Sequence, residues 1–227
     1  MITREHEMKL IELKNINFKY EDTLVFKDFC LEISRGQCVV IRGENGCGKT
    51  TLFRIINGLS YPQTGNYIFN GTQINEKYLK NNKNSKLFHK RIGYLFQNPD
   101  VMLFNGKVYD EIAFGPRQMG LDDQEVDKRV MDCMELFEIS SLADKAPYHL
   151  SGGQKKKVAL ASVMALNPDV LVLDEPFAGF DSKSREWLME FLTDLKSYGK
   201  TIIMSTHVEK IEEGLADKVI ILESLYN

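Results

Sequence analysis

A chain of 227 residues, 43% hydrophobic and 27% charged, is long enough to bury most of its unfolded surface in one large domain or two small ones. Its 29 basic and 32 acidic residues nearly balance, so its charge gives no reason to expect a nucleic-acid partner. No stretch approaches the run of about 18 apolar residues that a membrane span needs, and the charged amino terminus MITREHEMKLIELK lacks the apolar core of a signal peptide. We therefore expect a soluble protein that reaches a membrane only by docking on another protein.

The four cysteines are Cys30, Cys38, Cys47 and Cys133, and no two of them form a CxxC pair. Three of them lie in apolar or glycine-rich surroundings. This usage is typical of reduced thiols in a cytosolic protein, so we expect no disulfides.

Strand patterns open the chain. Residues 10–33 alternate in short pieces, and Asn70-Gly71 after NYIFN is a two-residue hairpin signal, so we expect an antiparallel edge of sheet. Four short, almost entirely apolar runs predict further strands at residues 38–41, 170–173, 201–204 and 219–222. Runs of this length, rich in β-branched residues and separated by helical patterns, fit a parallel sheet buried on both faces. The fold class is therefore α/β.

Two segments lie between these strands. Residues 77–91 carry six Lys or Arg and no acid, which predicts a solvated loop, with contact to anionic lipid as the alternative. From residue 121 to about 165 the period is helical, and Asp122 with Glu125 predicts a capping box. The apolar residues that recur on one helix face are Val126, Val130, Cys133, Met134 and Phe137. We interpret this section as a helical subdomain inserted in the core.

A phosphate-binding loop is predicted by GENGCGKTT at residues 43–51, because G-x-x-x-x-G-K-[ST] here follows a predicted strand and precedes a helix. Its glycines let the backbone N–H groups point inward, and the helix adds the positive end of its dipole. Lys49 would bridge the β- and γ-phosphates of a nucleotide, and the Thr50 hydroxyl would coordinate Mg²⁺. The expected nucleotide-binding residues of the loop are Gly43, Glu44, Asn45, Gly46, Cys47, Gly48, Lys49, Thr50 and Thr51.

Cys47 has two interpretations. At a helix amino terminus beside Lys49, the pKa of its thiol would be lowered and the cysteine would be reactive. It could equally be a small residue that fills space under the loop.

The second half of the expected metal site is VLVLDEP, at residues 170–176. An apolar strand that ends in two carboxylates puts Asp174 at its carboxyl end, where it would hold Mg²⁺ through water. Glu175 would then be the general base that polarises an attacking water.

The stretch LSGGQKKKVALASVMALNPDVLVLDEP, residues 150–176, resembles the signature motif of ATP-binding cassette (ABC) ATPases running into their Walker B strand. The resemblance implies a P-loop NTPase core with a RecA-like, mostly parallel sheet, an antiparallel β edge and an inserted helical subdomain. It implies one domain, 1–227, in which residues 1–96 and 166–227 form the nucleotide-binding core and residues 97–165 the Q-loop and signature subdomain. Ser151 would cap a helix whose amino terminus binds phosphate.

In this family the signature of one subunit closes on the nucleotide that the other subunit holds. The resemblance therefore implies a head-to-tail homo- or heterodimer around two ATP molecules, with Ser151, Gly153 and Gln154 acting on the partner's ATP. Many members continue into a carboxy-terminal segment that supports dimerisation, whereas this sequence stops at Asn227. We expect a weak dimer without a membrane partner.

Four more positions match the family. Tyr20 in NFKY sits where an aromatic ring stacks on adenine, and Asp181 in AGFD matches the D-loop. His207 in MSTH matches the switch histidine that contacts the γ-phosphate. Gln97 matches the Q-loop glutamine, which reaches Mg²⁺ and the attacking water.

A narrower resemblance concerns the segment after Gln97. FQNPD, LF and DEIAFGP resemble the ATPases of cobalt and nickel importers and of energy-coupling factor (ECF) vitamin importers. Met102, Leu103 and Phe104 would either line the groove for a coupling helix of the membrane subunit or pack inside the subdomain. Lys157, Phe180 and the residues NGKV at 105–108 depart from the family pattern, the last at a place where partner contacts are expected.

The resemblance implies a peripheral ATPase on the cytoplasmic face of the cell membrane, bound to an integral membrane subunit and driving import of a metal ion or vitamin. The alternatives are an ABC transporter of another subclass, a soluble ABC ATPase of DNA repair or translation, and a nucleotide-gated binding module without turnover. The soluble relatives carry a long coiled-coil insertion or two cassettes, and this sequence has neither.

Overall fold

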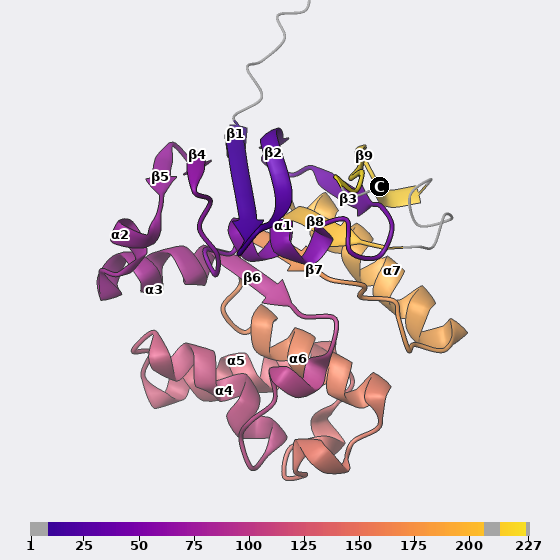
Figure 1. The fold of residues 1–227 in the computed structure, drawn as a ribbon. Coiled ribbons are helices and arrows are strands. Elements are labelled where there is room, and N and C mark those ends of the chain that lie inside the picture. Colours follow the sequence, from indigo (N-terminus) through magenta and orange to yellow (C-terminus); the bar gives the residue numbers. More distant parts are fainter. Residues whose placement is uncertain (1–8, 207–213, 226–227) are drawn as a thin grey trace, which may run out of the picture.

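The computed structural model describes residues 9–206 and 214–225. Within these ranges the chain forms two β-sheets with helices around them (Figure 1). The antiparallel sheet contains β1 (Lys9–Tyr20), β2 (Thr23–Ser34), β4 (Thr64–Phe69) and β5 (Thr72–Ile74), in the order β2-β1-β4-β5. Asn70 and Gly71 join β4 to β5 with φ angles of 48° and 76°, which confirms the predicted hairpin.

The parallel sheet has the order β6-β7-β8-β3-β9. Its strands are β3 (Cys38–Arg42), β6 (Ile92–Leu95), β7 (Val170–Leu173), β8 (Thr201–Ser205) and β9 (Lys218–Ile221). The runs at 38–41, 170–173 and 201–204 are fully buried, as predicted. The fourth run also forms a parallel strand, β9, as predicted, but its expected burial is wrong: β9 is an edge strand and its Ile221 is 70% exposed. The strand β6 was not predicted.

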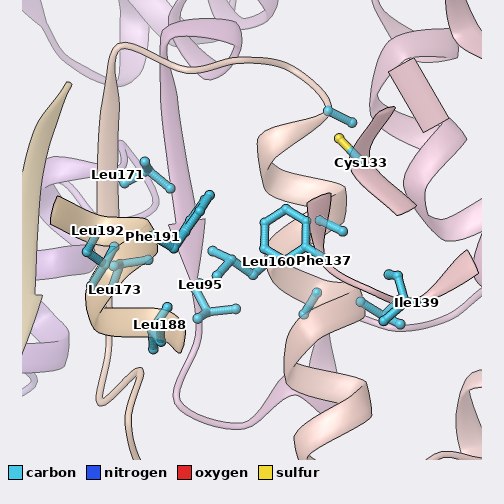
Figure 2. Close-up of a cluster of buried hydrophobic side chains, with 14 of the residues drawn as sticks. Leu95, Cys133, Phe137, Ile139, Leu160, Leu171, Leu173, Leu188, Phe191 and Leu192 are labelled. Carbon is cyan, nitrogen blue, oxygen red and sulfur yellow. The ribbon is translucent and has the colours of Figure 1, made fainter. Parts of the chain in front are cut away.

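Helices cover the parallel sheet because its residues alternate between two apolar faces. One face packs on α1 (Lys49–Ile56) and the antiparallel sheet, and the other on α4 (Val108–Gln118), α5 (Asp123–Leu136), α6 (Gly152–Met164) and α7 (Ser182–Ser197). Figure 1 shows α4, α5 and α6 grouped at the end of the molecule opposite the antiparallel sheet. In Figure 2 Leu95 and Leu173 of the strands lie near Leu160 of α6 and Leu188 of α7, within one buried cluster.

The predicted inward face of α5 is confirmed, since all five of its predicted apolar residues are buried. The capping box is only half present. Asp122 accepts from the backbone N–H of Glu125 at 2.9 Å, but the Glu125 carboxylate pairs with Arg129 at 2.8 Å. A charged partner one turn away competes for the side chain that would complete the box.

The basic segment is helical, so the predicted loop is wrong. It forms α2 (Glu76–Leu79) and α3 (Asn82–Arg91), which Leu79 and Phe88 anchor by being buried. Its lysines are exposed, in agreement with a solvated surface. Short 3₁₀ turns η1 (Pro99–Val101), η2 (Ser140–Leu142) and η3 (Pro147–His149) complete the described elements, and none of the helices in these ranges is long and apolar enough to cross a membrane.

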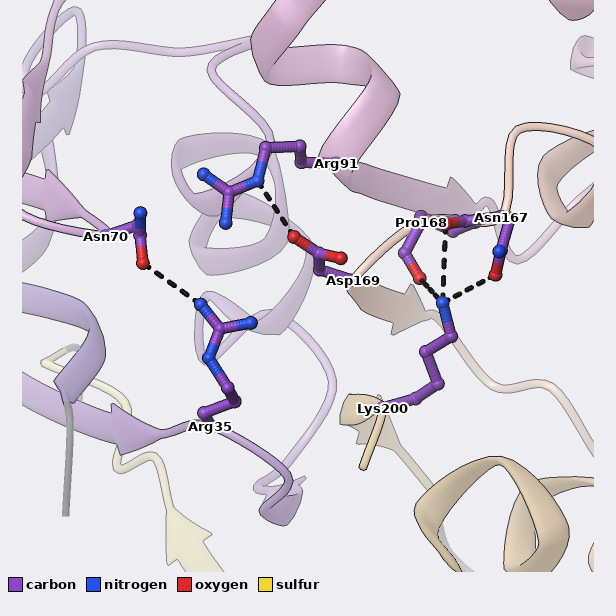
Figure 3. Close-up of polar contacts among 7 residues, drawn as sticks. All are labelled: Arg35, Asn70, Arg91, Asn167, Pro168, Asp169 and Lys200. Carbon is purple, nitrogen blue, oxygen red and sulfur yellow. Dashed lines mark hydrogen bonds and ion pairs between the residues drawn. The ribbon is translucent and has the colours of Figure 1, made fainter. Parts of the chain in front are cut away.

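Polar contacts tie together the amino ends of the parallel strands (Figure 3). Arg91 before β6 donates to Asp169 before β7 at 2.8 Å, and Lys200 before β8 donates to the Pro168 carbonyl at 2.7 Å. Arg35 and Asn70, which belong to connections of the antiparallel sheet, are joined at 3.0 Å. The opposite edge, where the parallel strands end, carries the predicted site.

Candidate functional site

The predicted phosphate loop runs from the end of β3 into α1. Gly43, Gly46 and Gly48 have φ angles of 147°, 86° and 105°, which residues with side chains adopt only under strain. A Cβ at Gly43 would lie 2.4 Å from the Leu222 carbonyl oxygen and 2.5 Å from Cys47 Sγ, so glycine is required there. Lys49 lies across the loop and donates to the carbonyls of Gly43 and Glu44 at 2.7 and 2.9 Å.

The fold brings Thr50 and Asp174 together across 124 residues of sequence. Thr50 Oγ1 donates to Asp174 Oδ2 at 2.9 Å, because α1 starts and β7 ends at the same edge of the sheet. Ser205, the last residue of β8, donates to the other carboxylate oxygen at 2.7 Å and accepts from the Glu175 N–H at 2.8 Å. Asp174 is therefore fixed from two sides.

These groups surround a cleft of about 480 Å³, which we name the phosphate cleft and whose size is typical of small-molecule sites. Its lining residues are Asn45, Gly46, Gly48, Lys49, Thr50, Thr51, Gln97, Asp174, Glu175 and Ala178. Gln97 reaches it from just beyond the end of β6. Tyr20 lies outside this lining, yet its hydroxyl accepts from Thr51 Oγ1 at 3.5 Å. Cys47 is only 3% exposed beneath the loop, which favours the packing interpretation of this cysteine.

A second cleft, also of about 480 Å³, gathers the signature residues, and we name it the signature cleft. Its lining includes Ser151, Gly153, Gln154 and Asp181. Ser151 and Gln154 form a reciprocal capping box at the start of α6, with hydrogen bonds of 3.0 and 3.3 Å. Asp181 caps α7 by accepting from the Ser184 N–H at 2.8 Å, and this hydrogen bond lowers the pKa of the Asp181 carboxyl. Most of the predicted site residues thus line one of two separate clefts of one chain, whereas Tyr20, Gly43, Glu44 and Cys47 line neither.

The predicted switch histidine, His207, lies outside the described residues.

The donors in the phosphate cleft suit Mg²⁺, since Thr50, Gln97 and Asp174 offer only oxygen or amide ligands. No group of three or more His, Cys, Asp or Glu able to hold a metal occurs in the described ranges. A magnesium ion would therefore need phosphate oxygens and water to complete its six ligands, as is usual in nucleotide sites.

The family model named ABC transporter matches residues 26–178. This chain belongs to the ABC transporter family. It is an ATP-binding protein of that family and an ATPase, and the P-loop α/β fold predicted from the sequence is confirmed.

Two relatives and one solved structure resemble this ABC protein along most of their length. A nickel import ATP-binding protein, LarO of Lactiplantibacillus plantarum, is 44% identical over 96% of this chain and 90% of the relative. The energy-coupling factor transporter ATP-binding protein EcfA of Methanocaldococcus jannaschii is 41% identical over 95% of this chain and 76% of the relative. The dimeric cassette MJ0796 with ADP and phosphate bound has a TM-score of 0.85 at 27% identity, covering 95% of this chain and 97% of that one.

The residues that depart from the family pattern each have a clear environment. Lys157 lies 4.3 Å above the Trp187 ring and pairs with Glu138 at 3.3 Å, while Phe180 is buried. Asn105 donates its backbone N–H and, at 3.1 Å, its side-chain amide to the buried carboxylate of Glu111. These two bonds close the loop in front of α4.

In the segment after Gln97, some apolar side chains pack inside the protein and others are exposed. Met102 and Leu103 pack against the core cluster, whereas Phe104 is 67% exposed and meets Phe114 of α4 edge to face at 5.0 Å. We name these two exposed rings, Phe104 and Phe114, the aromatic patch. Packing therefore explains Met102 and Leu103 but not Phe104.

Two polar residues that touch the site were not predicted: Ser205 and Lys156. A hydroxyl directly after the apolar run at 201–204 could have indicated Ser205, because it falls at the carboxyl end of a buried strand. Lys156 stands between two other lysines, so its sequence environment resembles a solvated face.

Proposed function

We propose that the chain is the ATP-hydrolysing motor subunit of a membrane importer of the ECF or cobalt and nickel type, which takes up a metal ion or a vitamin. The observation that carries the proposal is the pair of clefts in one chain, each with half of the groups that an ABC nucleotide site uses. The names of LarO and EcfA support the importer class, and the MJ0796 dimer supports assembly of two cassettes.

In the phosphate cleft, the loop N–H groups and Lys49 would bind the nucleotide phosphates. Tyr20, which lies beside the cleft, would stack on the adenine. Thr50, Gln97 and Asp174 would hold Mg²⁺, which neutralises charge that develops on the phosphate oxygens during transfer. Glu175 would accept a proton from the attacking water, and His207 would contact the γ-phosphate. Most of the rate enhancement would come from positioning and electrostatic stabilisation, because phosphoryl transfer asks little covalent chemistry of the protein.

In the signature cleft, Ser151, Gly153, Gln154 and Asp181 would complete the site of a second ABC subunit. ATP would close this dimer, and hydrolysis would reopen it. Residues 97–165 would move against a core formed by residues 1–96 and 166–227, with Gln97 at the junction. Such a two-state element responds to the presence of a γ-phosphate.

The aromatic patch would bind the membrane subunit, which keeps the chain on the cytoplasmic face of the membrane. An exposed cluster of large apolar side chains beside a ligand-sensing loop is typical of a docking surface. Lys155 of α6 pairs with Asp100 of η1 at 2.7 Å, so the signature helix and the segment next to the patch are in direct contact.

The hydrolysis mechanism is tested with Glu175→Gln. This variant should bind ATP, accumulate as an ATP-bound dimer and release no phosphate, whereas unchanged turnover would exclude Glu175 as the base. The transport assignment is tested by isolating the chain from detergent-solubilised membranes. Recovery with an integral membrane subunit supports an importer, and recovery only in the soluble fraction would favour the soluble ABC class.

A further inference from the structure

Lys156 is a buried lysine in the middle of the signature helix α6. Its residue surface is only 4% exposed, and its ammonium donates to the backbone carbonyls of Ala178 at 2.6 Å and Glu175 at 3.1 Å. It also lies 5.6 Å from the centre of the Phe180 ring. Burial lowers the pKa of Lys156, while the nearby charge of Glu175 raises it. An ammonium taken out of water is costly unless its donors are satisfied, and here backbone carbonyls satisfy two of them.

Glu175 has an unusual backbone conformation at the point that Lys156 contacts. Its φ angle is 48°, in the left-handed region that a residue with a Cβ seldom occupies. The surroundings hold both of its backbone polar groups. The N–H donates to Ser205 Oγ at 2.8 Å, and the carbonyl accepts from Lys156 at 3.1 Å and from the Ala178 N–H at 3.2 Å.

A strained conformation persists only where neighbouring groups enforce it, and such residues cluster at functional sites. Relaxation of Glu175 to an ordinary φ angle would turn its side chain away from its present place in the lining of the phosphate cleft. Lys156 and Ser205 come from different elements, α6 and β8. Lys156 hydrogen-bonds to the backbone carbonyl of Glu175, and Ser205 to its backbone N–H. Of the two, only Lys156 also belongs to the helix that begins in the signature cleft.

We propose that Lys156 is a positioning residue for ATP hydrolysis, which holds the backbone of Glu175 so that its carboxylate stays in the phosphate cleft. This inference rests on the proposed role of Glu175 as the base. It gives the two clefts of one chain a direct link, because Lys156 lies one turn along the helix whose amino terminus meets the second subunit's nucleotide. Binding of that nucleotide would thereby stabilise the working conformation of Glu175 in the same chain.

The test compares Lys156→Met, Lys156→Gln and Lys156→Arg in the full chain, with kcat and KM for MgATP measured separately. Methionine keeps the length without a donor, glutamine keeps a neutral donor, and arginine keeps a charged donor. We expect kcat to fall by about tenfold or more in Lys156→Met, because small displacements of a reacting group reduce rates strongly. Lys156→Gln should lie between this variant and Lys156→Arg, and KM should stay within about twofold, since Lys156 does not line the phosphate cleft.

Lys200→Met is the matched control. Lys200 also donates to backbone carbonyls, of Pro168 and Asn167 (Figure 3), and burial also lowers its pKa. It lies at the amino ends of the strands, however, and lines neither cleft. This variant should lower thermal stability and leave kcat unchanged.

An unchanged kcat in Lys156→Met would overturn the inference, as would an equal loss in Lys156→Arg or a loss of kcat in the control. If Lys156→Met does not fold, the comparison of Lys156→Gln with Lys156→Arg decides in the same way. Glu175→Gln separates this inference from the proposed function: turnover that survives in Glu175→Gln removes the proposed base itself. Turnover lost in Glu175→Gln but kept in the Lys156 variants removes only the positioning role.

Discussion

Replacing Phe104 with serine separates a docking role of the aromatic patch from a packing role. Phe104 is 67% exposed, so about a third of a side chain that can bury roughly 150–250 Å² is covered. At about 25 cal/mol per Å², removing that contact costs roughly 1–2 kcal/mol, and loss of the edge contact with Phe114 adds about 0.5–1.5 kcal/mol. A fully buried phenylalanine would cost about 3–5 kcal/mol when truncated.

Phe104→Ser should therefore fold, with the free energy of unfolding lowered by about 2–3 kcal/mol, and should keep the ATPase activity of the isolated chain. Its affinity for the membrane subunit should fall by about 30-fold, the equivalent of the 2 kcal/mol that marks an interface anchor. Urea unfolding, phosphate release and co-purification with the membrane subunit measure these three quantities. Tyr198→Ser is the control, because Tyr198 is more exposed and caps the end of α7, and it should retain the membrane subunit. Loss of more than about 4 kcal/mol, or unchanged partner binding, would refute the docking role.

Gly43→Ala should weaken ATP binding at least tenfold, because its methyl group would lie 2.4 Å from the Leu222 carbonyl oxygen. Gly71→Ala is the control: it has a strained φ angle but open space around the new methyl group, so it should bind ATP normally. Normal ATP binding by Gly43→Ala would contradict the prediction. Burial opposes ionisation of Asp217, but hydrogen bonds from the Cys38 N–H and Lys196 outweigh it and lower the pKa of the Asp217 carboxyl. Ionised Asp217 therefore stabilises the folded chain above about pH 4, and this stabilisation is lost as the pH falls through the lowered pKa. The urea midpoints of wild type and Asp217→Asn should accordingly converge below about pH 4, and a constant difference down to pH 2 would contradict the assignment. Iodoacetamide should label the exposed Cys30 before the buried Cys47, with or without ATP, and ATP-protected labelling of Cys47 would restore the reactive interpretation.

Sequence patterns predicted the parallel core well where strands are continuous apolar runs, as at residues 38–41 and 170–173. They missed β6, because Gly93 and Tyr94 interrupt the run and a basic helix precedes it. They overestimated the burial of β9, because β9 lies at the edge of the sheet. Strand order decides which strand is at the edge, and the residues of a strand do not reveal that order. The helices α2 and α3 were missed because only Leu79 and Phe88 anchor a segment dominated by basic and amide side chains.

The site residues were predictable where motif and topology coincide, as at Thr50 and Asp174. The phosphate loop and the carboxyl end of β7 had to meet at one edge of the sheet, and they do. The roles of the three consecutive lysines were not predictable. Successive helix positions differ by about 100° in direction, so Lys155 reaches Asp100, Lys156 reaches Glu175 and Ala178, and Lys157 lies over Trp187. Only the three-dimensional structure shows that Lys156 is buried while Lys155 and Lys157 are not.

The central claim, that each nucleotide site needs two chains, is tested most directly by adding Gly153→Asp to Glu175→Gln. A Cβ at Gly153 meets only the Phe180 ring at 3.6 Å in its own chain, so the substitution should not disturb folding, while the new carboxylate would repel the partner's phosphates. Mass measured by light scattering with MgATP should show a dimer for Glu175→Gln and a monomer for the double variant, and both should bind ATP with similar affinity. A dimer of the double variant, or loss of its ATP binding, would contradict the two-chain site.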